Sequence, residues 1–111
     1  MGRFVVGDIV VIAFPFTDLS SVRRRPALVL SVLEGDDIVI CEITSVIRKD
    51  SYAVLLENDD LESGKLKVRS IIRPNLILTI DRNKINYTFG KVKDLKLREV
   101  FEKLKLVFKM T

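Results

Sequence analysis

The sequence predicts a small, mostly antiparallel β-barrel that is completed by one C-terminal helix. About six apolar runs of strand length, rich in β-branched residues, are separated by polar or glycine-containing turns. After residue 94, apolar residues instead recur at the spacing of an amphipathic helix. Many short strands closed by one helix are typical of a small antiparallel barrel. The 111 residues form a single predicted domain, residues 1–111.

The composition predicts a globular protein of the cytoplasm. The chain is 48% hydrophobic and 31% charged, which is ordinary for a folded domain and unlike a disordered one. No apolar run approaches the roughly 20 residues of a membrane span. The first four residues lack the apolar stretch of a signal peptide. The single cysteine, Cys41, cannot form an internal disulfide bond, so we expect a cytoplasmic location and no membrane association.

Two predicted strands, residues 9–14 and 27–33, flank a polar loop over residues 15–24. A loop of this length is longer than a hairpin needs, so it is either functional or an ordinary surface loop. Pro26 cannot donate a hydrogen bond to a strand ladder, which predicts that it stands at the start of the second strand. Three arginines then lie at the junction of loop and strand, where they can bind an anion: Arg23, Arg24 and Arg25.

The third predicted strand, residues 38–44, has two different faces. Val39, Cys41 and Ile43 form a wholly apolar face that belongs in the core. The opposite face begins with isoleucines and ends with Glu42 and Thr44. Thr44 and Ser45 therefore emerge at the strand end, where they either contribute to a site or simply terminate the strand and cap the next turn.

The next segments are predicted from alternation and from turn residues. A short strand over 52–56 precedes an acidic loop over 58–64, and residues 65–73 then alternate as a strand. Pro74 interrupts the ladder, so further strands are expected over 76–80 and 87–92. The alternation places four cations on one strand face: Lys65, Lys67, Arg69 and Arg73. Such a face can track phosphates, or it can protect an edge strand from aggregation.

Asp94 is a suitable N-cap for the predicted C-terminal helix. The helix presents an apolar stripe that should pack across an open end of the sheet: Leu97, Val100, Phe101, Leu104, Val107 and Phe108. Residues 91–111 hold seven basic and three acidic residues, whereas residues 1–90 are balanced. This basic end suits attraction to a polyanion or an acidic protein segment, and it equally suits an ordinary solvated helix face.

The residue types exclude several kinds of catalytic site. The chain has no histidine, which excludes histidine-based zinc hydrolases and the two-histidine ribonuclease mechanism. It has no glycine-rich nucleotide-binding loop, and its one cysteine has no histidine partner. The carboxylates are scattered, which disfavours a two-metal nuclease. We therefore predict no metal and no cofactor. Arginines and hydroxyl groups remain, and they suit RNA because RNA supplies its own 2′-OH nucleophile.

Several short motifs, in the same order along the chain, resemble the MazF/PemK family of toxins. The N-terminal signature is carried by Gly7-Asp8-Ile9-Val10, by the segment FPFTD at 14–18 and by RRPALVLS at 24–31. Ile43-Thr44-Ser45 resembles the family's ITS element, and SIIR at 70–73 with TID at 79–81 resembles its last element. The resemblance implies a CcdB/MazF-like, SH3-like barrel that forms a homodimer and is bound by a cognate antitoxin. It also implies a sequence-specific endoribonuclease that acts on single-stranded RNA.

The resemblance assigns roles to individual residues. Arg25 and Thr44 match positions implicated at the scissile phosphate, and Arg73 matches an arginine of the Kid/PemK branch that acts in proton transfer or transition-state stabilisation. The implied RNA-binding residues are Thr17, Asp18, Arg23, Arg24, Ser45, Arg69, Ser70 and Asn75. The chain departs from the family at two positions. Relatives carry a carboxylate at position 75, where this chain has asparagine, and an arginine at position 78, where it has leucine. An amide cannot accept a proton at neutral pH, so the general base is unassigned, with Glu42 and Asp18 as candidates.

The resulting hypothesis is a metal-independent endoribonuclease that leaves a 2′,3′-cyclic phosphate and a 5′-OH end. The alternative is a non-catalytic barrel that binds RNA or a protein target such as a topoisomerase, which Asn75 motivates. A third hypothesis is a dimeric scaffold whose basic helix docks on DNA.

Overall fold

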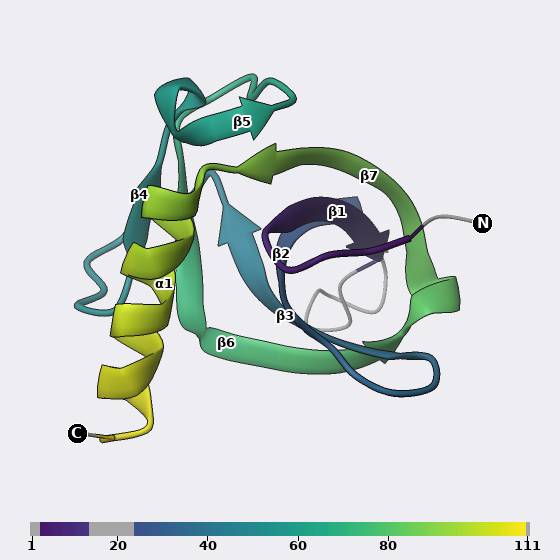
Figure 1. The fold of residues 1–111 in the computed structure, drawn as a ribbon. Helices are drawn as coiled ribbons and strands as arrows, with labels where there is room; N and C mark the ends of the chain where they lie inside the picture. The colour runs from purple at the N-terminus through teal and green to yellow at the C-terminus, as the bar shows by residue number, and fades with distance from the viewer. Residues whose placement is uncertain (1–2, 14–23, 111) are drawn as a thin grey trace, which may run out of the picture.

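The computed structural model describes residues 3–13 and 24–110. Within these residues, seven strands form one antiparallel sheet that curls into an open half-barrel, and one helix lies beside it (Figure 1). The elements are β1 (Asp8–Ala13), β2 (Arg24–Val32), β3 (Asp37–Thr44), β4 (Val54–Leu56), β5 (Leu61–Ser63), β6 (Ser70–Asp81), β7 (Ile85–Val92) and α1 (Asp94–Val107), with short 3₁₀ helices at Asn58–Asp60 and Arg82–Lys84. The strand order is β4-β6-β3-β2-β1-β7-β5. The predicted fold class is confirmed.

Each face of the sheet covers its own apolar cluster. The helix-side core includes Leu28, Cys41, Ile43, Ile72 and Val100. The barrel-side core consists of Val10, Ile12, Ala27, Val29, Ile38 and Ile40, with further side chains packed around it. The alternation predicted for β3 is therefore confirmed, because Cys41 and Ile43 lie on one side of the sheet while Ile38 and Ile40 lie on the other.

Pro26 lies inside β2 rather than at its start, which corrects the expected strand boundary. Arg24 and Arg25 already pair with Ala13 and Ile12 of β1, and Pro26 itself lies opposite Val11. The ladder with β1 thus extends past the proline on its N-terminal side. Arg25 is consequently held by a paired strand and not by the end of a loop.

β6 runs through Pro74 without a break, although the sequence predicted two separate strands. The register with β3 passes from Glu42 opposite Arg73 to Cys41 opposite Ile77, so residues 74–76 form a bulge. Proline is tolerated at a bulge because the ladder is interrupted there and no N–H donor is needed. β6 bends sharply along its length (Figure 1), as expected for a bulged strand. Arg73 lies immediately before this bulge.

The predicted strand over residues 65–69 is wrong, and with it the face of four cations. These residues form a loop that precedes β6, and Lys65, Lys67 and Arg69 are exposed. Only Leu66 turns inward, where it joins the helix-side core. The Asn58 side chain holds the Leu66 backbone by accepting from its N–H at 2.7 Å and donating to its carbonyl at 3.3 Å. The apparent alternation therefore reflects one anchored leucine in a polar loop.

β5 occupies the segment that was predicted as an acidic loop. Leu61 is buried and pairs with Val92 of β7, which gives the short strand its place at the edge of the sheet. The following Gly64 has a φ of +87° and lies directly against Phe89 and Gly90 of β7. A Cβ atom there would stand 2.6 Å from the Phe89 carbonyl oxygen and 2.8 Å from the Gly90 Cα. No side chain fits without moving one of the two strands.

Gly64→Ala is expected to destabilise the fold by more than the cost of its backbone conformation. The left-handed backbone costs a non-glycine residue about 1–2 kcal/mol, and forced contacts in a packed region add roughly 1–3 kcal/mol. Gly35→Ala is the matched control, because Gly35 also has positive φ (+76°) but no atom lies within 4 Å of the place that an added methyl group would take. Denaturant unfolding should show the larger loss for Gly64→Ala. Equal losses at the two positions would contradict the crowding.

The N-cap position of α1 is Lys93 instead of the predicted Asp94, and Lys93 makes no capping hydrogen bond with its side chain. Asp94 is the first residue of the helix, where a negative charge still interacts favourably with the helix dipole. Val100 and Leu104 are buried, whereas Phe101 and Phe108, which were expected in the packed stripe, are exposed. Two other features hold the helix: Lys96 Nζ donates to the Leu55 carbonyl at 2.8 Å, and Lys103 Nζ donates to the Ser51 carbonyl at 3.2 Å. Part of the basic C-terminal charge therefore serves the fold.

In the part of the chain that is described, no helix has the length and apolarity to cross a membrane.

Candidate functional site

Four polar side chains continue the barrel-side core at one end of three neighbouring strands. We call this set the polar row: Arg25 of β2, Glu42 and Thr44 of β3, and Arg73 of β6. Side chains alternate along a strand, so Arg25 shares the face of Ala27, and Glu42 and Thr44 share the face of Ile40. Arg73 lies directly opposite Glu42. In the β2–β3 register, Arg25 corresponds to Thr44, two residues beyond the last pair of that ladder.

Arg73 is held between two carboxylates from different parts of the chain. Its Nη1 lies 3.3 Å from Glu42 Oε1, and its Nε donates to Asp50 Oδ2 at 3.2 Å. The Arg73 side chain is 18% exposed, and both carboxylate side chains are 9% exposed. Such a desolvated pair of contacts fixes the guanidinium far better than a surface ion pair would.

Asp50 was not predicted as a site residue. It belongs to the segment between β3 and β4, where its Oδ1 also accepts the Tyr52 backbone N–H at 2.9 Å. Burial alone would raise the pKa of Asp50, but the Tyr52 N–H, the Arg73 guanidinium and the Asn75 side chain together hold the pKa below its usual value. Asn75 thus acts on Asp50 in the sense that favours its charged form, whereas a carboxylate at position 75 would place two like charges together.

Arg25 carries a buried donor that suits an anionic ligand. Its Nε atom is inaccessible to solvent and has no hydrogen-bond partner among the described residues. Leaving a buried donor unsatisfied costs about 1–3 kcal/mol, so a partner that arrives with a ligand would recover that cost. A phosphate oxygen is such a partner, because the guanidinium fork matches it.

Thr44 is buried, and its hydroxyl oxygen accepts the Val46 backbone N–H at 3.1 Å. The O–H group donates to no other described residue, so a hydroxyl that caps the turn can also donate to a ligand. The only cysteine is not a nucleophile here, because burial and the nearby Glu42 charge raise the pKa of the Cys41 thiol.

Other predicted site residues do not join the polar row. The Ser70 hydroxyl donates to the Val68 carbonyl at 3.1 Å, and Ser70 lies on the face of Ile72, opposite that of Arg73. Arg24 and Ser45 are exposed. The remaining predicted RNA-binding residues lie outside the described residues: Thr17, Asp18 and Arg23.

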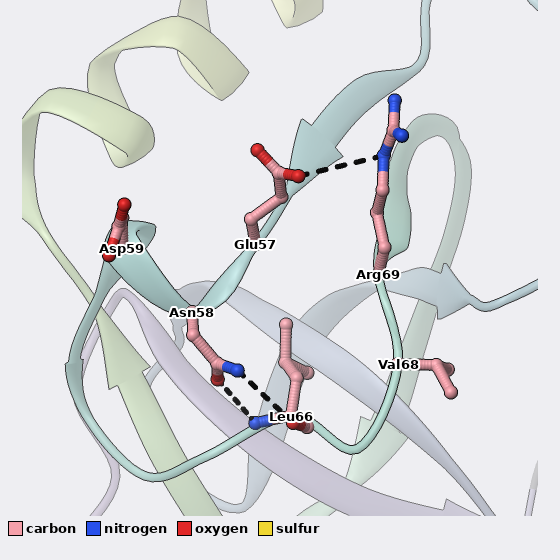
Figure 2. Close-up of a pocket in the computed structure, with 6 residues that line it drawn as sticks. All are labelled: Glu57, Asn58, Asp59, Leu66, Val68 and Arg69. Atoms are coloured by element: carbon pink, nitrogen blue, oxygen red, sulfur yellow. Dashed lines mark hydrogen bonds and ion pairs between the residues drawn. The ribbon is translucent and has the colours of Figure 1, made fainter.

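Arg69 belongs to a separate surface pocket, shown in Figure 2. Its Nε lies 3.7 Å from Glu57 Oε2, and both side chains are exposed. The pocket is lined by Glu57, Asn58, Asp59, Leu66, Val68 and Arg69. The figure also shows the two hydrogen bonds between the Asn58 side chain and the Leu66 backbone, so this lining amide is satisfied within the chain.

Within residues 3–13 and 24–110, no three carboxylate or thiol side chains gather closely enough to hold a metal ion. The chemistry available at the polar row and at the neighbouring Asp50 is therefore that of two arginines, one hydroxyl and two carboxylates. This set can bind a phosphate, neutralise charge that develops on it and accept a proton.

Several solved structures have the same fold as this chain. The Mycobacterium tuberculosis toxin MazF-mt6 has a TM-score of 0.76 at 16% identity, covering 94% of this chain and 98% of that one. A mycobacterial endoribonuclease in complex with its cognate antitoxin has a TM-score of 0.75 at 12% identity, covering 98% of both chains. A MazE-MazF structure from Deinococcus radiodurans has a TM-score of 0.74 at 25% identity, covering 96% of both chains.

The sequence itself gives a more direct assignment than these structural likenesses. No curated protein matches the chain significantly. The model of one protein family, however, matches residues 6–108, which is nearly the whole chain and includes every member of the polar row. By that match the chain belongs to the PemK-like, MazF-like toxins of type II toxin–antitoxin systems.

Proposed function

We propose that this toxin is a metal-independent, sequence-specific endoribonuclease that cleaves single-stranded RNA. The observation that carries the proposal is the polar row, in which Arg25, Thr44 and Arg73 occupy one face of three adjacent strands. The family assignment and the similar endoribonuclease from a mycobacterial species support it. The polar row combines groups that an RNA transphosphorylation needs: two guanidinium groups and a hydroxyl group that can bind the phosphate. None of these three groups requires a metal ion to act.

In the proposed reaction the 2′-oxygen of the ribose attacks the adjacent phosphorus. The 2′-O–P bond forms as the P–O5′ bond breaks, and the products are a 2′,3′-cyclic phosphate and a 5′-OH end. Negative charge builds on the phosphate oxygens during the attack, and Arg25 and Arg73 offset that charge while the Thr44 hydroxyl donates to one oxygen. Fixed donors are effective here because they need no reorganisation when the charge develops.

We propose partners from the same family assignment. A type II toxin is neutralised by a protein antitoxin, and similar structures contain such a complex. An acidic, partly disordered antitoxin segment that folds on binding would suit the basic side chains of this chain. The protein is proposed to act in the cytoplasm as a homodimer.

The test is cleavage of a long, mixed-sequence single-stranded RNA by the purified protein in the presence of EDTA. We expect discrete cuts whose ends are a 2′,3′-cyclic phosphate and a 5′-OH. Replacing the ribose at a mapped cut by 2′-deoxyribose should abolish that cut, because the nucleophile is then missing. Binding of the RNA without any cleavage would contradict the proposal and favour the non-catalytic alternative.

A further inference from the structure

We propose that Glu42 accepts the proton of the attacking 2′-hydroxyl group, and that Asp50 is a positioning residue that holds Arg73 beside it. This inference rests on the proposed ribonuclease function and assigns the general base that the function requires. It arises from the different ways in which the two carboxylates contact the same arginine.

The chain offers few proton acceptors at this place. It has no histidine, and the Asn75 amide cannot take up a proton near neutral pH. Arginine remains protonated, so Arg25 and Arg73 cannot serve as bases either. Among the described residues, the carboxylates that form ion pairs with Arg73 are Glu42 and Asp50.

Both carboxylate oxygens of Asp50 accept hydrogen bonds from other parts of the chain. Its Oδ1 accepts the Tyr52 backbone N–H at 2.9 Å, and its Oδ2 accepts Arg73 Nε at 3.2 Å. These donors and Asn75 outweigh the effect of burial and hold the pKa of Asp50 below its usual value. A carboxylate stabilised in this way is a weak base, and both of its oxygens have partners.

One carboxylate oxygen of Glu42 has no hydrogen-bond partner among the described residues. Its Oε1 lies 3.3 Å from Arg73 Nη1, and its Oε2 makes no hydrogen bond to any described residue. Glu42 stands two residues from Thr44 on the same strand face and directly opposite Arg73. A phosphate held by Thr44 and the two arginines would therefore lie next to the carboxylate, within the reach that proton transfer from a neighbouring ribose requires.

The proposed step balances without any further reagent except water. The 2′-O–H bond breaks and its proton passes to Glu42 Oε2, while the 2′-O–P bond forms. The P–O5′ bond breaks, and the departing 5′-oxygen takes a proton from water to give the 5′-OH end. Glu42 then returns its proton to solvent, which restores the starting carboxylate.

The charged groups around Glu42 determine the expected pH dependence. Arg73 faces Glu42 from β6, and Asp50 contacts Arg73 from the segment after β3. Arg25 of β2 lies on the same face of the sheet as Glu42. The arginines keep their charge across the useful pH range, so the acidic limb of the rate profile should report the carboxylates. That limb is a readout that a purely structural role for Glu42 would not change.

The experiment compares Glu42→Gln with Asp50→Asn, using cleavage of the mixed-sequence RNA and the pH profile of kcat/KM. Glu42→Gln should lower kcat about 10²-fold, with little change in KM, and should abolish the acidic limb. Asp50→Asn should lower kcat as well, because Arg73 is less well held, but it should keep the limb. Glu102→Gln on the exposed face of α1 is the matched control and should behave like the parent.

Each result decides between stated alternatives. A Glu42→Gln variant that cuts within about tenfold of the parent and keeps the acidic limb overturns the inference. Loss of the limb in Asp18→Asn instead of Glu42→Gln also overturns it, and assigns the base to the N-terminal loop. If thermal melting shows that Glu42→Gln does not fold, Glu42→Asp is used in its place. Its shorter side chain holds the carboxylate farther from the 2′-hydroxyl group, so it should cleave more slowly and keep the acidic limb. Cleavage by Glu42→Asp at the parental rate overturns the proposed role of Glu42. If the unsubstituted protein does not cleave RNA, the proposed function itself is overturned, and this outcome differs from every result of the variants.

Discussion

Arg25→Ala is expected to lower the rate of RNA cleavage by about 10²–10³-fold, the usual cost of removing one fixed donor to a developing oxyanion. The loss should appear in kcat, because the guanidinium is proposed to act on charge that develops during the reaction. The fold should tolerate the change, since it deletes a buried Nε donor that has no partner among the described residues. Single-turnover cleavage of the mixed-sequence RNA and thermal melting measure the two effects separately.

Two further variants sharpen this result. Arg98→Ala removes an exposed arginine of α1 and should cut like the parent, which controls for the loss of one positive charge. Arg25→Lys keeps the charge but loses the planar fork, so it should recover only part of the activity. Parental cleavage by Arg25→Ala would remove Arg25 from the site and with it the polar row as the place of reaction.

The parts of this fold that the sequence predicts best are those in which the two faces of a strand pack against different cores. β3 was predicted almost to the residue because Cys41 and Ile43 face one core while Ile38 and Ile40 face the other. If β3 were shifted by one residue, its two faces would be exchanged and Glu42 and Thr44 would be buried in the helix-side core. The pattern of side chains therefore allows only one register for β3. The position of Thr44 at the strand end follows from the same pattern.

The errors have local physical causes. Residues 65–69 alternate like a strand, but their one buried side chain, Leu66, is fixed by Asn58 rather than by a ladder. Pro74 indicated a break because proline cannot donate, yet a bulge removes the need for a donor. In both places the deciding contact comes from a neighbouring segment, which periodicity does not record.

The candidate site shows the same limit. Motifs identify Arg25, Thr44 and Arg73, because each stands in a recognisable stretch of sequence. Asp50 stands in a polar link with no motif, and it reaches Arg73 across 23 residues of chain. The signal that could have found it is the absence of a carboxylate at position 75, which leaves Arg73 in need of an anionic partner from elsewhere.

Arg73→Met is expected to destabilise the fold by about 3 kcal/mol at neutral pH, because it removes the cation that lies between two nearly buried carboxylates. Arg69→Met is the matched control, since it breaks only the exposed contact with Glu57 and should cost under about 1 kcal/mol. Urea unfolding at pH 7 measures both losses. Equal losses for the two variants would show that the contacts of Arg73 with Glu42 and Asp50 are no stronger than a surface pair.

The loss should also depend on pH, with a sign that follows from the two states of Asp50. In the parent the pKa of Asp50 lies below its usual value, so its stabilisation is present above the ordinary carboxyl range and disappears as the pH falls through the lowered pKa. Without Arg73, the pKa of Asp50 should rise, because burial still raises it and the guanidinium that lowered it is gone, so the folded variant takes up a proton at this carboxyl group more readily than the parent does. The difference in unfolding free energy between parent and variant should therefore be largest near pH 7 and should narrow as the pH falls through the carboxyl range toward the lowered pKa of Asp50 in the parent. A difference that stays constant over this range would place the cost of Arg73→Met in lost packing and not in the two carboxylates.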